Sequence, residues 1–271
     1  MRNFINYLAL FAFIASLSAC EKKIDLNLPG TTPQYVIEGV LTNELGGCKV
    51  LVSQTKAFTG DNSFNGIDGA QVTISNNGNT YDVTPAAKGV YQNNVLAGIP
   101  GQSYQLSVRV NGKVFTGICT MPQQVALDSI YLAKDNMNNN KDGSIRKYVK
   151  VKYHDPATIK NYYRFIQYID DRKEKTVFAD DDEFTNGQEV NSELKANNLD
   201  DPAREIHPGN HVTIEMLNID AEVYKYWFSL DNSAAGDGNN AAPANPVTNI
   251  KGGALGYFSA HTLQRKTLIA P

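Results

Sequence analysis

The densest group of potential ion ligands is the acidic run Asp180-Asp181-Asp182-Glu183, with two further aspartate pairs nearby in the sequence. Carboxylate oxygens are the ligands that calcium prefers. The spacing does not follow a calcium-binding EF-hand, because consecutive carboxylates point in different directions and no alternating series of ligands follows. We therefore interpret Asp180, Asp181 and Asp182 as part of a solvated loop, weak candidates for a metal site, and expect no cofactor.

Aromatic residues suggest a second kind of chemistry, stacking on a sugar or on a planar ligand. The segment from Asn161 to Ile169 contains Tyr162 and Tyr163, and strand alternation would place them on opposite faces. Because both faces carry bulky side chains, we expect a central strand whose aromatic residues mostly fill a core. Tyr257 and Phe258 lie among glycines and suit either contact with a partner or a tightly packed strand.

Histidines and catalytic motifs give no support for an active site. His207 and His211 are four residues apart, a spacing that suits metal binding on a helix, but Pro208-Gly209 between them prevents that helix. The sequence has no Gly-x-Ser-x-Gly, His-Glu-x-x-His or phosphate-binding-loop motif. We predict that the protein is not an enzyme. A secreted hydrolase with an unrecognised site is an alternative hypothesis, ranked below the two binding functions given at the end of this section.

The first of three cysteines follows an apolar N-terminal run. Residues 1–19 have a short basic start, an apolar centre and small residues at the end, as secretory signal peptides do. Leu17-Ser18-Ala19-Cys20 looks like a bacterial lipobox, which implies cleavage before Cys20 and acylation of its thiol by lipids such as palmitate. Residues 20–33 are polar, contain Pro and Gly, and are predicted to tether the folded part to the membrane.

The other two cysteines, Cys48 and Cys119, form an even pair in an oxidising compartment, where a disulfide is possible. Two buried free thiols are the alternative. No Cys-x-x-Cys motif or Cys/His cluster exists, so the sequence does not predict a structural zinc site.

Composition narrows the class of protein. The chain of 271 residues has a formal charge of −3 and is 20% charged, so it lacks the basic surface that nucleic-acid binding requires. Its 14 Tyr and 11 Phe favour β structure. The mature chain of 271 − 19 = 252 residues would form one large or two ordinary domains, and no second apolar segment is long enough to span a bilayer.

Short alternating strands dominate the chain after residue 33. About seven of them fit within residues 34–121, with tight turns at Asn77-Gly78 and Asn111-Gly112. This pattern predicts a β-sandwich domain that looks like immunoglobulin or transthyretin-like sandwiches. Residues 122–271 are predicted to form a β-rich domain with one amphipathic helix at Asp220–Ser233.

An ordered series of short motifs points to a family. YVIEGVLTNE, GVY, PGQSYQLSV, DSIYL, DPATIKNYYRF, YKYWFSL and GGALGYFSA occur in this order. The series resembles a family of Bacteroidota outer-membrane lipoproteins of unassigned function, commonly encoded beside TonB-dependent receptors. The resemblance implies a lipid-anchored accessory or substrate-binding partner of such a receptor β-barrel, facing the cell surface. It implies no catalytic residues, and the second hypothesis is a cell-surface adhesin or glycan-binding module.

Overall fold

The computed structural model describes residues 32–56, 63–196, 201–234 and 245–271. The predicted signal peptide and nearly all of the predicted tether lie outside these ranges. Residues 33–271 form one compact unit. The strands are β1 (Tyr35–Thr42), β2 (Cys48–Gln54), β3 (Gln71–Asn76), β4 (Asn79–Ala87), β5 (Val90–Asn93), β6 (Ser103–Val110), β7 (Lys113–Thr120), β8 (Leu127–Asn139), β9 (Ile145–His154), β10 (Tyr162–Ile169), β11 (Arg172–Lys173), β12 (Phe178–Asp181), β13 (Glu189–Leu194), β14 (His211–Ile219), β15 (Ile250–Lys251) and β16 (Leu255–Ile269).

The predicted mainly β class is confirmed. Thirteen strands form one mixed sheet in the order β11-β10-β14-β16-β1-β2-β5-β4-β3-β6-β7-β15, and β12 pairs with β10 at one end. The remaining strands form a second sheet in the order β13-β9-β8. One α-helix, α2 (Ala221–Ala234), and one short 3-10 helix, η1 (Pro202–Arg204), complete the elements of the described residues.

Strand β16 joins the early and late parts of the chain. It pairs in parallel with β1, so that Ile37 lies beside Gly256, and antiparallel with β14, so that Leu217 lies beside Leu263. The predicted boundary at residues 121 and 122 directly follows β7, but the large sheet continues across it through β16. The division into two domains at that position remains a prediction.

Two apolar cores form where the large sheet is covered. In the first core, β1, β2 and β16 pack with β3, β6 and β7, and Phe258 is fully buried between two glycines of different strands. A Cβ atom at Gly39 would lie 2.9 Å from Phe258, and a Cβ atom at Gly117 would lie 2.9 Å from it as well. These glycines leave the space that the phenyl ring fills. The second core lies between β10 and β14 of the large sheet and β9 and β13 of the small sheet.

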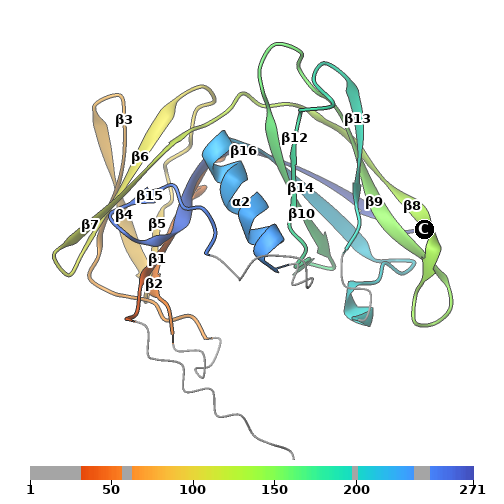
Figure 1. The fold of residues 1–271 in the computed structure, drawn as a ribbon, viewed down its shortest axis with the longest axis horizontal. Helices are drawn as coiled ribbons and strands as arrows, with labels where there is room; N and C mark the ends of the chain where they lie inside the picture. Colours follow the sequence, from red (N-terminus) through yellow and green to blue (C-terminus); the bar gives the residue numbers. More distant parts are fainter. Residues whose placement is uncertain (1–31, 57–62, 197–200, 235–244) are drawn as a thin grey trace, which may run out of the picture. The chain divides into compact units, whose positions relative to one another are not determined.

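Helix α2 forms because its sequence combines a cap with an apolar stripe. The Asp220 carboxylate accepts a hydrogen bond of 2.9 Å from the backbone N–H of Val223, which satisfies a donor that the first helical turn leaves free. Val223, Tyr226 and Trp227 are buried against the sheet. The helix contacts β10, β12 and β16 (Figure 1). The predicted helix is therefore confirmed within one residue at each end.

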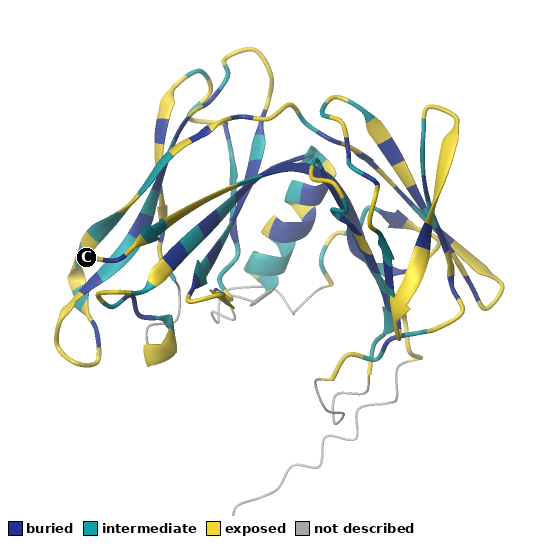
Figure 2. Cartoon of the chain, turned by 180° about the vertical axis from the view of Figure 1, so that it is seen from behind, coloured by how far each residue is buried: buried dark blue, intermediate teal, exposed yellow. Residues whose placement is uncertain are grey.

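Several polar or glycine-rich segments of the chain form strands. β8 extends to Asn139 through an asparagine-rich polar segment, and the polar residues 189–194 form β13. The glycine-rich segment from residue 250 contributes β15 and the start of β16, which is buried along most of its first half (Figure 2). Pairing with neighbouring strands outweighs local propensity in each case.

No helix among the described residues is long and apolar enough to cross a membrane.

The close contact between β1 and β16 can be tested at Gly256. Its φ is +99°, and a Cβ atom there would lie 2.0 Å from the carbonyl oxygen of Ile37. Gly256→Ala combines backbone strain with a main-chain clash and should lower the free energy of unfolding by roughly 3 kcal/mol or more. Urea unfolding followed by circular dichroism measures this change.

Gly253→Ala is the matched control. Gly253 also has a positive φ of +87°, but a Cβ atom there would meet nothing within 4 Å. The control should lose only about 1–2 kcal/mol. Equal losses in the two variants would contradict the close approach of the two strands.

Candidate functional site

A cavity of about 320 Å³ lies beside helix α2. Three residues of β10 (164–166), the segment 173–177 that follows the β10–β11 turn, and Trp227 and Leu230 of the helix line it. Its volume is at the lower end of the range of small-molecule sites. Its lining combines one indole ring and aliphatic side chains with three cationic side chains, Arg164, Lys173 and Lys175.

Arg164 is the central polar group of this cavity. Strand alternation places it on the face of β10 that α2 covers, where only 9% of it is exposed. Its Cζ atom lies 3.2 Å from the centre of the Trp227 ring, so the guanidinium stacks on the indole. Burial lowers the pKa of Arg164 to about 10. Its Nε atom is buried and has no hydrogen-bond partner, and the guanidinium forms no ion pair with the described residues.

The other charges at the cavity do not neutralise Arg164. Lys173 lies close enough that burial, followed by the charge of Arg164, lowers the pKa of its ammonium group. Glu174 is a carboxylate of the same segment, but Arg204 holds it through two nitrogen atoms, one of them Nε at 3.1 Å. Burial would raise the pKa of Glu174, but the hydrogen bonds from Arg204 and from the Thr176 backbone lower it overall. The cavity therefore has a surplus of positive charge.

Two more distant carboxylates lie on the same side of the sheet. Glu215 accepts hydrogen bonds from Arg265 at 2.7 Å and from the Tyr168 hydroxyl at 3.2 Å, so it is already paired. Glu38 on β1 forms no ion pair with the described residues, and burial raises its pKa although Lys173 and Arg164 lower it. The charges of Lys173 and Arg164 therefore act on Glu38, but neither cation forms an ion pair with it.

Aromatic residues fix the position of Trp227. Its ring lies 5.2 Å from Tyr226 and 5.0 Å from Tyr257, both in edge-on arrangements. Burial raises the pKa of Tyr257 to about 12, so its hydroxyl stays protonated at neutral pH. Tyr257, a predicted contact residue, is thus a buried support of the Trp227 ring.

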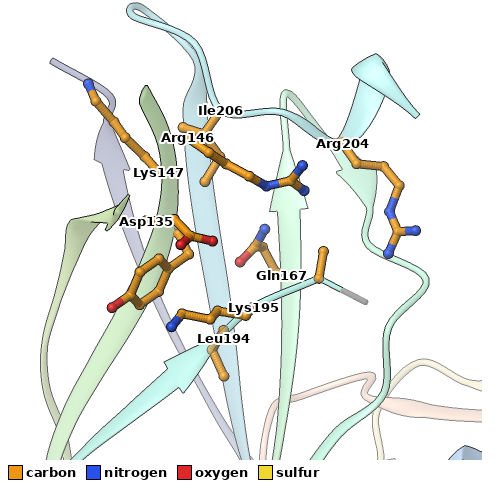
Figure 3. A pocket seen from close by; sticks show the side chains of 10 residues that line it. Asp135, Arg146, Lys147, Gln167, Leu194, Lys195, Arg204 and Ile206 are labelled. Atoms are coloured by element: carbon orange, nitrogen blue, oxygen red, sulfur yellow. The ribbon is translucent and has the colours of Figure 1, made fainter. Parts of the chain in front are cut away.

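A second, much smaller cavity of about 20 Å³ lies between β10 and the small sheet (Figure 3). Arg146 and Gln167 point toward one another across it, and both are buried. Arg146 Nη1 and Gln167 Oε1 have no hydrogen-bond partner. This volume suits one water molecule that accepts from the guanidinium and donates to the amide, so the cavity is too small for an organic ligand.

The other predicted aromatic contact residues are placed differently from one another. Tyr163 is fully buried in the second core, where its hydroxyl donates to Asp155, and Phe258 is fully buried in the first core. Tyr162 is half-buried, 5.0 Å from the Tyr224 ring. Tyr162 is therefore the member of the predicted set whose ring borders the surface of the helix.

The carboxylates of the acidic run diverge. Asp180 accepts a hydrogen bond from Ser192 at 2.8 Å, Asp182 accepts from the backbone of Asn161 at 2.8 Å, and Asp181 lies 4.0 Å from Lys160. Burial raises the pKa of Asp180. The described residues contain no group of three or more His, Cys, Asp or Glu side chains able to hold a metal.

The disulfide considered for Cys48 and Cys119 is not formed, because both are buried free thiols. Cys119 Sγ accepts a hydrogen bond of 3.1 Å from the backbone of Ala260 in β16. Burial raises the pKa of both thiols, that of Cys48 to about 11. Both are therefore protonated at neutral pH and behave as small core residues. Cys20 lies outside the described residues.

A buried polar pair lies on β16. Ser259 Oγ is 2.8 Å from His261 Nδ1, and both residues are less than 5% exposed. Burial, followed by the charge of Arg164, lowers the pKa of His261 to about 3. His261 is therefore neutral and weakly basic. His207 and His211, the pair with metal-like spacing, lie on either side of a turn at Gly209, whose φ is +90°.

Sequence reasoning did not select Arg164 or Trp227 as site residues, although both lay in recognised elements. Arg164 is the one charged residue of a strand that was expected to be central and that is otherwise aromatic and apolar apart from Gln167. A charged residue in a strand that is predicted to be buried could have indicated the site, because a buried charge needs a partner. The amphipathic pattern of residues 220–233 predicts the helix that carries Trp227, but it does not predict the contact of this ring with Arg164.

Comparison with known proteins places the chain in a family. The family model described as Domain of unknown function (DUF4249) matches residues 21–267, and the chain belongs to this family. No curated protein matches the sequence.

The buried neutral state of His261 predicts a pH dependence of stability. Its pKa is about 3 in the folded state, below the ordinary value of 6.5, so the unfolded state binds the additional proton between these two values. The contribution of His261 to the free energy of unfolding is complete above pH 6.5 and is lost progressively as the pH falls toward 3. The unfolding free energy of the wild type, relative to His261→Gln, should fall by up to about 1.4 kcal/mol per pH unit in that window.

Urea unfolding at several pH values between 7 and 4.5 measures this difference. The glutamine side chain can still bond Ser259 but does not titrate. Parallel pH profiles for the wild type and the variant would show that the imidazole is not kept neutral by its surroundings.

Proposed function

We propose that this member of the DUF4249 family is a lipid-anchored, non-enzymatic binding protein of the outer membrane. In this proposal it faces the cell surface and serves as an accessory or substrate-binding partner of a TonB-dependent receptor. The cavity beside α2 carries the binding part of the proposal, because it combines a suitable volume with a buried, unpaired guanidinium. The membrane part rests on the sequence before residue 34.

Anchoring and binding fit together in this proposal. Cys20 would carry the acyl chains, and residues 21–33 would give the folded unit reach from the membrane. The DUF4249 match begins at residue 21, directly after that cysteine. We also propose that β1–β7 form the immunoglobulin or transthyretin-like sandwich expected from the sequence, and that this unit presents the rest of the chain to a partner.

A glycan-binding or adhesin role is the second candidate, and one observation favours it. Tyr162, Tyr224 and Phe228 form a ladder of rings with centroid separations of 5.0 and 5.7 Å. Phe228 is 51% exposed. Aromatic rings of this kind can stack on the apolar faces of sugars.

The anchor is tested by Cys20→Ser in the native organism. The variant should lose incorporation of labelled palmitate and move from the membrane fraction to the soluble fraction, because the acyl acceptor is absent. Unchanged labelling and membrane attachment would show that another residue or segment holds the protein. Protease accessibility on intact cells then reports which side of the membrane the folded unit occupies.

The receptor partnership is tested by affinity isolation of the tagged protein from detergent-solubilised outer membranes. A TonB-dependent receptor barrel should co-purify in near-stoichiometric amount. The control carries residues 1–33 fused to an unrelated soluble domain, which reports co-isolation through shared micelles. Recovery of no barrel, or equal recovery with the control, would contradict the partnership, and binding to immobilised glycans would then favour the second candidate.

A further inference from the structure

We infer that the cavity beside α2 binds an acidic ligand, through a carboxylate or phosphate group held by Arg164 and Lys173. This inference rests on the proposed binding function and specifies the chemical class of its ligand. It starts from a cation that is more than nine-tenths buried and has no counter-ion among the described residues.

A buried guanidinium requires compensation. Removing a charge from water carries a large cost that a partner of opposite charge or hydrogen-bond acceptors must offset. Stacking on Trp227 offsets part of it but uses one face of the guanidinium and none of its N–H groups. The donors at the edge of the group remain available, and their planar fork matches the two oxygens of a carboxylate or phosphate.

The remaining charges favour an anion over a neutral ligand. Lys173 and Lys175 line the same cavity, and neither ammonium group has an ion-pair partner among the described residues. Glu174 faces the cavity but is held by Arg204, so it does not repel an anion strongly. Glu38 and Glu215 lie outside the lining. Trp227 and the aliphatic residues Ile166, Val177 and Leu230 give the ligand an apolar wall beside its acidic group.

The position of the cavity also suits a ligand that orders the helix. Arg164 and Lys173 belong to the strand pair β10–β11, whereas Trp227 and Leu230 belong to α2. An anion that binds Arg164 would stabilise the cation that stacks on the helix. Binding should therefore increase the thermal stability of the unit as well as saturate a site.

The experiment measures binding to the purified full mature protein by calorimetry and by thermal unfolding. The probes are D-glucuronate, its neutral counterpart D-glucose, and inorganic phosphate, all at constant ionic strength maintained with NaCl. Glucuronate or phosphate should raise the melting temperature in a concentration-dependent way, and glucose should not. A response to glucuronate alone assigns a sugar or organic carboxylate, and a response to phosphate alone assigns a phosphorylated ligand.

Three variants make the assignment specific to the site. Arg164→Met should weaken anion binding at least tenfold while leaving the unliganded protein as stable as the wild type or more stable, because a buried unpaired charge is removed. Lys173→Met should weaken binding severalfold. Arg172→Met is the matched control, since Arg172 is the neighbouring exposed residue of β11 and does not line the cavity.

The inference is overturned if neither anion binds the wild type, or if Arg164→Met binds as tightly as Arg172→Met. Should Arg164→Met fail to fold, the double variant Lys173→Met/Lys175→Met provides the same test with two exposed positions. Co-purification of the receptor without anion binding would overturn only this inference. If the anion binds but no receptor co-purifies, the result supports the inferred ligand class and contradicts the proposed partnership with a TonB-dependent receptor.

Discussion

The pairing of β16 with two strands from distant parts of the chain is the constraint on which the rest of the structure depends. β1 forms its parallel neighbour and β14 its antiparallel neighbour, so the last strand connects the first core to the second. A parallel pair requires a long connection, and here nearly the whole described chain provides it. The close approach at Gly256 is a local consequence, because the strand must run within contact distance of the Ile37 carbonyl.

That central position gives β16 two faces with different chemistry. One face packs Phe258 and Ala260 into the first core, while the other places Tyr257, Ser259 and His261 on the side that α2 covers. A polar group beneath a helix is unfavourable unless neighbours satisfy it. Ser259 and His261 satisfy each other, and Tyr257 supports Trp227, but the Nε atom of Arg164 on β10 has no such partner. The unsatisfied group therefore lies at the wall of a cavity, where a ligand can reach the rest of the side chain.

The sequence predicted the strands and the helix better than it predicted their partners. Alternation of apolar residues located β1–β7 and β10, and the helical period located the capped helix, because these patterns depend on residues close together in the chain. It did not reveal β13 or the full length of β8, whose polar residues are stabilised by pairing across the small sheet. The candidate site was missed for the same reason. Arg164 and Trp227 are separated by 63 positions, and neither is unusual until the sheet and the helix meet.

The energetic role of Arg164 differs from that of the core residues around it. Replacing a buried phenylalanine leaves a void and costs stability, whereas replacing a buried, unpaired cation by an apolar side chain of similar volume is often neutral or favourable. The stability of the fold alone therefore does not account for an arginine at this position. A bound anion changes this balance, since the same guanidinium becomes a charge-assisted hydrogen-bond donor in a site of low water content. Because the guanidinium also stacks on α2, any free energy gained from the anion is shared with the docking of the helix. A partner that contacts the exposed side of α2 and shifts Trp227 would therefore change the affinity of the cavity for the anion. By thermodynamic reciprocity, the anion would change the affinity for that partner by the same factor.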